Sequence, residues 1–86
     1  MFKLIFKEKF ERSFSKLDKP LKIQVWDKIQ QLKMAAPLGK RLIGNSYWSL
    51  HIGKYRVIYI LHHHTQEVEI IDLWERKHDY RELRNF

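Results

Sequence analysis

Hydrophobic residues recur at helical spacing in the first half of this chain and alternate with polar residues in the second half. The two spacings predict different elements. The short apolar run FKLIF at residues 2–6, with one charge inside it, predicts a strand. Beyond it, Phe10, Phe14 and Leu17 are spaced so that they form one stripe of a helix. The chain is therefore expected to begin with a strand followed by a helix.

A second helix is predicted from a proline and a further apolar stripe. Pro20 suits the first helical turn, because its missing N–H would have no partner there. The apolar residues that follow at helical spacing are Leu21, Val25, Ile29 and Leu32. The join between the two helices is short, so we expect them to be antiparallel neighbours. Residues 35–46 contain Pro37, Gly39 and Gly44 and are expected to form a loop.

Three strands are predicted in the second half. Residues 47–52 alternate between an apolar face and a partly polar one. The apolar set is Trp48, Leu50 and Ile52, and the other set is Tyr47, Ser49 and His51. A Gly-Lys turn leads into residues 55–61, and the turn HHHTQ at 62–66 leads into residues 67–74. The predicted fold class is α+β: a strand, an antiparallel helical hairpin, a three-stranded antiparallel meander and a short C-terminal helix or tail, with the first strand joining the sheet.

Arg56 is a bulky cation in an otherwise apolar strand. No acidic residue lies within ten positions of it on either side. The alternation places it on the side opposite the apolar row of the strand, and therefore on a face that the helices leave open, beside Ser49 and His51. Such an arginine is either held for a ligand or paired across the sheet with Asp72 or a glutamate of the last strand.

Length, composition and charge narrow the class of protein. With 86 residues, 44% of them hydrophobic, the chain is expected to form a single domain, residues 1–86. It has no cysteine, which excludes disulfides and thiolate chemistry. Together with the absence of a signal-peptide core or a membrane-spanning run, this fits a cytoplasmic protein.

The net charge of +7 is concentrated in residues 1–43, which hold eleven Lys or Arg against four Asp or Glu. An excess of this size suits a polyanionic partner, either nucleic acid or an acidic protein. A solvated lysine-rich surface is the alternative. The candidates for phosphate contact are Lys40, Arg41, Lys54 and Lys77.

The end of the chain carries residue types that suit a phosphate. In an extended conformation Arg76, His78 and Tyr80 point to the same side. Arginine can clamp a phosphate, histidine can transfer a proton near neutral pH, and tyrosine can stack on a base. A solvated charged tail is the alternative reading.

Three adjacent histidines at 62–64 raise the question of a metal site. Neighbouring side chains in a turn point in alternating directions, and no acid is expected close by on the same side. A solvated turn is therefore the prediction, with no metal and no cofactor.

Three stretches together resemble the RelE/ParE superfamily of toxins from toxin–antitoxin pairs. They are KRLIG (40–44), YWSLHIGKYRVIY (47–59) and RKHDYR (76–81). The resemblance covers nearly the whole chain, and its most specific part is the glycine turn followed by Tyr-Arg and an apolar strand. It implies a small α+β sandwich and, for the RelE-like branch that this chain resembles more, a ribosome-dependent endoribonuclease that cuts mRNA in the A site and inhibits translation.

The resemblance also implies a mechanism and partners. The ribose 2′-OH would attack the adjacent phosphate without a metal. Arg56 and Arg76 would stabilise the developing charge, and Tyr80 would stack on the base or aid proton transfer. The roles of acid and base would belong to two histidines, His51 and His78. The implied partners are the ribosome, mRNA and an acidic, partly disordered cognate antitoxin, with no membrane involved.

The chain departs from the resemblance at one position, and two other functions stay open. The family often has two basic residues on the strand before the glycine turn, where this chain has Ser49 and His51. Ser49 supplies no charge, which leaves a non-catalytic basic binding module as one alternative. ParE-like members, which inhibit DNA gyrase, are the other; the Arg76, His78 and Tyr80 set favours RNA cleavage over that activity.

Overall fold

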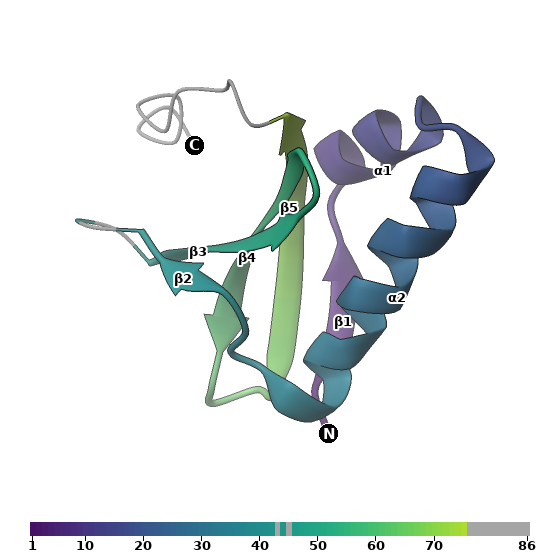
Figure 1. Ribbon diagram of the computed structural model, residues 1–86. Helices are drawn as coiled ribbons and strands as arrows, with labels where there is room; N and C mark the ends of the chain where they lie inside the picture. The colour runs from purple at the N-terminus through teal and green to yellow at the C-terminus, as the bar shows by residue number, and fades with distance from the viewer. Residues whose placement is uncertain (43, 45, 76–86) are drawn as a thin grey trace.

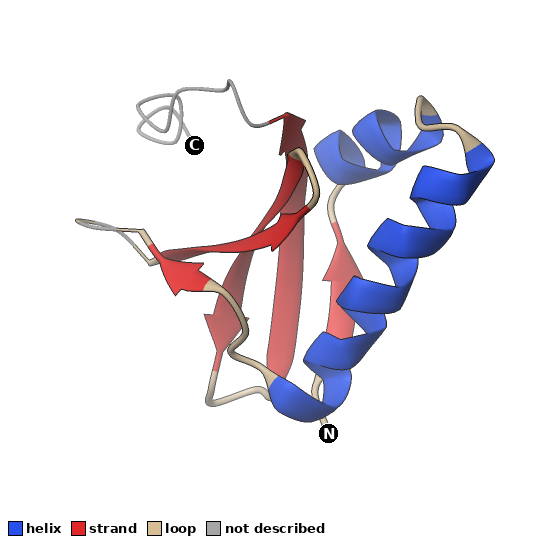
Figure 2. Ribbon diagram, in the orientation of Figure 1, coloured by secondary structure: helices blue, strands red, loops and turns tan. Residues whose placement is uncertain are grey.

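The computed structural model of the protein describes residues 1–42, 44 and 46–75. Its elements in chain order are β1 (Lys3–Phe6), α1 (Glu8–Ser15), α2 (Lys19–Ala35), β2 (Lys40–Arg41), β3 (Tyr47–Ile52), β4 (Tyr55–His62) and β5 (Glu67–Glu75). Both helices lie to one side of the sheet, and the chain turns back between them (Figure 1; Figure 2). The predicted α+β class and the order of strand, two helices and three strands are confirmed. The predicted C-terminal helix or tail lies outside the described residues.

The sheet is larger than predicted and it is mixed. Its five strands follow the order β1-β5-β4-β3-β2. Strand β1 runs parallel to β5, whereas the other pairs are antiparallel. The sequence indicated neither β2 nor the parallel pairing. A two-residue strand is too short to show a period, and pairing between the two ends of the chain leaves no local signal.

Helix α2 begins where the sequence predicts. Asp18 is its N-cap, and the side-chain Oδ1 accepts a hydrogen bond from the Leu21 N–H at 3.0 Å. This bond satisfies one of the backbone donors that a helix leaves without partners in its first turn. Pro20 occupies the same turn, as its missing N–H favours. In residues 1–42, 44 and 46–75, no helix is both long enough and apolar enough to cross a bilayer.

The main core lies between the helices and the sheet. The apolar faces predicted for β3 and β4 both point into it, as the alternation requires. The strand residues buried there include Leu50, Ile52, Val57 and Tyr59, and the helix residues include Phe10, Val25, Ile29 and Leu32. This packing leaves the opposite face of the sheet, which we call the open face, available for the polar side chains of the same strands.

A second, smaller apolar cluster lies on the open face. Its buried members are Leu42, Ile58, Ile71 and Trp74. A bulge in β5 explains it, because Ile58 lies opposite Asp72 while Tyr59 lies opposite Ile70, so that Ile71 is the extra residue. The bulge interrupts strict alternation in β5. It therefore gives the open face an apolar base that the alternation of the sequence does not predict.

Tyr59 ties the loop before β2 to the core. Its side chain is fully buried. The hydroxyl donates to the Leu38 carbonyl oxygen and accepts from the Leu38 N–H at 2.9 Å. Burial raises the pKa of Tyr59 from an ordinary value near 10 to about 12, although the hydrogen bond with Leu38 opposes the rise. The tyrosine therefore resists ionisation in the folded state more than in the unfolded chain.

Tyr59→Phe is expected to lower the free energy of unfolding by about 1–3 kcal/mol at pH 8, because it leaves both polar groups of Leu38 without their partner. The pKa of Tyr59 is higher in the folded protein than in the unfolded chain, so the neutral hydroxyl contributes its full stabilisation below pH 10. That contribution is lost as the pH rises from 10 to 12. The difference in stability between wild type and variant should therefore narrow over this interval. Urea unfolding of both proteins at pH 8, 10 and 11.5 tests this, and a constant difference would contradict it.

Gly39 lets the chain approach β3 closely. Its φ is +90°, and a Cβ atom there would overlap the carbonyl oxygen of Ser49. Gly44 has a similar φ of +82°, but a Cβ atom there would meet nothing within 4 Å. The two glycines therefore share a left-handed backbone and differ in crowding.

Gly39→Ala is expected to lower the free energy of unfolding by more than Gly44→Ala, which should cost only about 1–2 kcal/mol of backbone strain. The additional loss at Gly39 comes from the overlap with the backbone of β3. Thermal unfolding of the two variants side by side measures the difference. Equal losses would mean that the loop moves away from β3 without penalty.

Candidate functional site

His51 and Arg56 lie opposite each other on the open face. They are register partners in the β3–β4 hairpin, the second pair from the Gly53–Lys54 turn. Residues paired in this way have Cβ atoms roughly 4.5–5.5 Å apart. His51 is exposed and Arg56 is half-buried. The structure thus brings two predicted site residues together, one able to accept a proton and the other a fixed cation.

On the other side of Arg56, the register places Trp74 of β5. The Trp74 indole is buried, and its Nε1–H donates to Asp72 Oδ2 at 2.8 Å. Asp72 Oδ1 accepts from Ser13 Oγ of α1 at 3.0 Å and from the Leu73 N–H at 2.8 Å. These bonds join α1 to β5 and hold the indole ring beside Arg56, so the arginine stands on a rigid part of the sheet.

The register bears on the ion-pair alternative for Arg56. Asp72, proposed as a cross-strand partner, lies opposite Ile58 and not opposite Arg56. Its carboxylate already accepts from the hydroxyl, amide and indole donors described above. The sheet register therefore does not place Arg56 and Asp72 as a direct cross-strand pair.

The predicted phosphate-binding cations are distributed over different parts of the hairpin and edge strand. Lys40 lies opposite Ser49, and Arg41 lies opposite Trp48, whose side chain packs against the main core. Lys54 is in the turn, with its Nζ 5.8 Å from the ring centroid of Tyr55. Lys40 therefore shares the open face, whereas Arg41 is on the helix side. The remaining predicted residues, Arg76, Lys77, His78 and Tyr80, lie outside the described part of the chain.

A groove of about 370 Å³ lies where α1 meets the open face, and it was not predicted from the sequence. Residues of α1 and the residue before it form one wall, and open-face residues form the other. The lining residues are Lys7, Glu8, Lys9, Arg12, Tyr47, Ile60, Glu69 and Ile71. Two ion pairs, each at 3.6 Å, join Lys7 to Glu69 and Arg12 to Glu8 and offset part of the positive charge. The basic first half of the sequence was the only signal for this surface.

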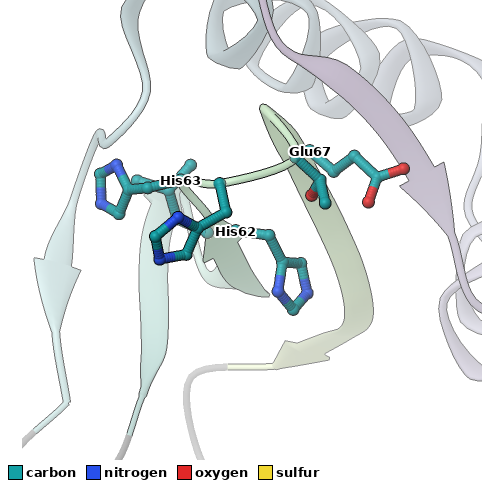
Figure 3. Close-up of a pocket in the computed structure, with 6 residues that line it drawn as sticks. His62, His63 and Glu67 are labelled. Atoms are coloured by element: carbon teal, nitrogen blue, oxygen red, sulfur yellow. The ribbon is translucent and has the colours of Figure 1, made fainter.

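The histidine turn lies between β4 and β5, where His62 and His63 lie near Glu67 (Figure 3). Its three histidines are exposed. The expectation that no acid lies beside them is wrong for His62, because its Nε2 is 2.9 Å from Glu69 Oε1. The β4–β5 pairing brings that glutamate close. Among the residues that the structure describes, no group of three or more His, Cys, Asp or Glu is arranged to hold a metal ion.

The fold of this chain is similar to that of several solved toxin structures. The isolated E. coli RelE toxin is 16% identical and superposes with a TM-score of 0.80, covering 99% of this chain and 95% of that one. The toxin–antitoxin complex RelBE2 from Mycobacterium tuberculosis is 21% identical and superposes with a TM-score of 0.78, covering 90% of this chain and 93% of that one. The archaeal RelE–RelB complex from Pyrococcus horikoshii OT3 is 16% identical and superposes with a TM-score of 0.75, covering 91% of this chain and 98% of that one. At these identities the likeness establishes the fold alone.

Family membership comes from the sequence. No curated protein sequence gives a significant match. One family profile, described as the ParE toxin of the type II toxin–antitoxin system parDE, matches residues 4–80. The superfamily resemblance is confirmed, although the matching profile is that of ParE whereas the sequence motifs favoured the RelE-like branch. The chain therefore belongs to the ParE toxin family of type II toxin–antitoxin systems, within the RelE/ParE superfamily.

Proposed function

We propose that this toxin is a ribosome-dependent endoribonuclease that cuts mRNA in the A site and so stops translation. The observation that supports it is the His51–Arg56 pair on the open face. Cleavage by a ribose hydroxyl needs a proton acceptor and a positive charge near the same phosphate. Adjacent strands of a hairpin hold two such groups at a fixed spacing, which suits that chemistry.

In the proposed reaction, His51 accepts the proton of the ribose 2′-OH while that oxygen attacks the neighbouring phosphorus. The bond from phosphorus to the 5′-oxygen breaks, and the 5′-oxygen takes up a proton. The products are a 2′,3′-cyclic phosphate and a 5′-hydroxyl. Arg56 stabilises the negative charge that builds up on the phosphate oxygens during the attack, through charge-assisted hydrogen bonds.

The remaining roles rest on the family resemblance. Arg76 would supply another cation, and His78 or Tyr80 would give the proton to the leaving 5′-oxygen. All of these groups are side chains, so the route calls for no metal or cofactor. We further propose that the toxin acts in the cytoplasm as one domain, and that an acidic cognate antitoxin covers its basic surface. Relatives have been crystallised with the antitoxin RelB.

Inhibition of DNA gyrase is the second candidate function. It is supported by the profile match, since the matching family is that of ParE toxins. ParE-like members resemble this chain in fold and often share the strand arginine. The two functions make different demands on the site, because only RNA cleavage needs a group that accepts the proton of the 2′-OH.

Primer extension on an mRNA held in a translating ribosome separates the candidates. With purified protein added, we expect cuts within the A-site codon that end in a cyclic phosphate, and none on the same RNA without ribosomes. A parallel assay with gyrase and plasmid DNA scores double-strand breaks. Breaks without RNA cuts would replace the proposal with gyrase inhibition. Neither product, from a folded protein, would indicate the non-catalytic binding module.

A further inference from the structure

Ser49 leaves an uncharged position in the middle of the proposed site. It is on the same face of β3 as His51, two residues away, and is buried with 7% of its surface exposed. The register places Ile58 on one side of it and Lys40 of the edge strand β2 on the other. Directly paired residues of antiparallel strands project from the same face. Strand β2 thus brings a cation to the position where β3 has none.

The neighbours of Lys40 confirm which way it faces. Leu42, two residues further on, is buried in the open-face cluster with Ile58 and Trp74. The Leu42 N–H donates to the Tyr47 carbonyl oxygen at 2.9 Å, so the pairing with β3 continues at least that far. Side chains two positions apart in a strand share a face. Lys40 therefore lies on the open face.

The edge strand is held close to β3 at this point. The backbone of Gly39 lies against the Ser49 carbonyl in a space that no Cβ atom could enter. On the other side of Lys40, the anchored Leu42 fixes the strand. The backbone of Lys40 is therefore secured on both sides, while its side chain is exposed to solvent. An exposed cation on a held backbone is suited to binding a polyanion.

We infer that Lys40 is a substrate-binding residue that holds the phosphate backbone of single-stranded RNA in place of a basic residue at position 49. This rests on the proposed function. Lys40 is a diagonal neighbour of His51, at roughly 7–8 Å between backbone positions, a gap that a lysine side chain can cross. The site would then take one phosphate at Arg56, where cleavage occurs, and a neighbouring phosphate at Lys40, which binds it as a point charge.

The chain offers a matched control for Lys40. Arg41 is the next residue, is also exposed, carries the same charge and lies in the same two-residue strand. It differs in its face, since it lies opposite Trp48 on the helix side of the sheet. The sequence alone grouped Arg41 with Lys40 as a candidate for phosphate contact, but this placement keeps Arg41 out of the proposed site on the open face. Any loss caused simply by lower net charge or by a disturbed edge strand should appear in both alanine variants.

The experiment compares wild type, Lys40→Ala, Arg41→Ala and Lys40→Arg on programmed ribosomes. Lys40→Ala should raise KM for the ribosome–mRNA complex about tenfold, as expected for one lost charged contact, with a smaller change in kcat. Arg41→Ala and Lys40→Arg should stay within about twofold to threefold of wild type. Circular dichroism verifies that all four proteins fold.

Binding to a single-stranded RNA oligonucleotide gives a second readout that does not need cleavage. The slope of log K against log salt is negative, and one lost phosphate contact makes it shallower by about 0.7. We expect this change in Lys40→Ala and not in Arg41→Ala. If wild type cuts mRNA but the two alanine variants behave alike in both assays, the inference is overturned. If wild type does not cut, the proposed function fails, and equal salt slopes then overturn the inference as well.

Discussion

Arg56→Ala is expected to lower the rate of ribosome-dependent cleavage by about 100-fold to 1000-fold, the range found when one preorganised stabilising group is removed from an active site. The reason is its place in the sheet. Arg56 stands between His51 and the buried Trp74, on a row that the Asp72 hydrogen bonds hold in position. A cation fixed before the substrate arrives needs no rearrangement as the phosphate gains charge.

The measurement is a single-turnover cleavage rate on ribosomes stalled at one codon. Arg41→Ala is the control, because it removes an arginine of the same sheet from the opposite face. Arg56→Lys should lie between wild type and Arg56→Ala, since lysine keeps the charge but loses the paired hydrogen bonds of a guanidinium group. Loss of the folded circular dichroism spectrum in Arg56→Ala would instead support a structural ion pair, whereas full activity in a folded variant would show that Arg56 does not stabilise the transition state.

The prediction of this site from the sequence succeeded where the pattern was local. Alternation in residues 47–52 and 55–61, together with a two-residue turn, fixes which side chains of β3 and β4 share a face. That is why the amino-acid pattern alone is enough to place His51 and Arg56 together. The start of α2 was predicted for the same reason, since Pro20 favours the first helical turn and a helix start depends on a few consecutive residues.

What the sequence did not predict depends on contacts between distant segments. Nothing near Lys40 indicates that it pairs with Ser49, because a strand of two residues has no period. The bulge at Ile71 changes which residues of β5 share a face, and it appears only when β5 is aligned with β4. The open face consequently seemed polar in the sequence, whereas the structure gives it an apolar base and a lysine from the sheet edge.

His51→Gln is expected to lower the cleavage rate by about 100-fold to 10,000-fold, the usual contribution of a positioned general base. Glutamine keeps a polar side chain of similar reach but cannot take up the proton of the 2′-OH. The side chain is exposed on the open face, so the substitution should not disturb the core.

His62→Gln is the matched control for this prediction, since it removes an exposed histidine from the far end of β4, where its partner is Glu69. It should leave the cleavage rate unchanged. Because His51 and Arg56 would act on the same transition state, their effects should not add, and the double variant should be little slower than the slower single one. If the folded His51→Gln protein cleaves at the wild-type rate, another residue must be the base. If the losses in the double variant are fully additive, His51 and Arg56 do not act as a unit.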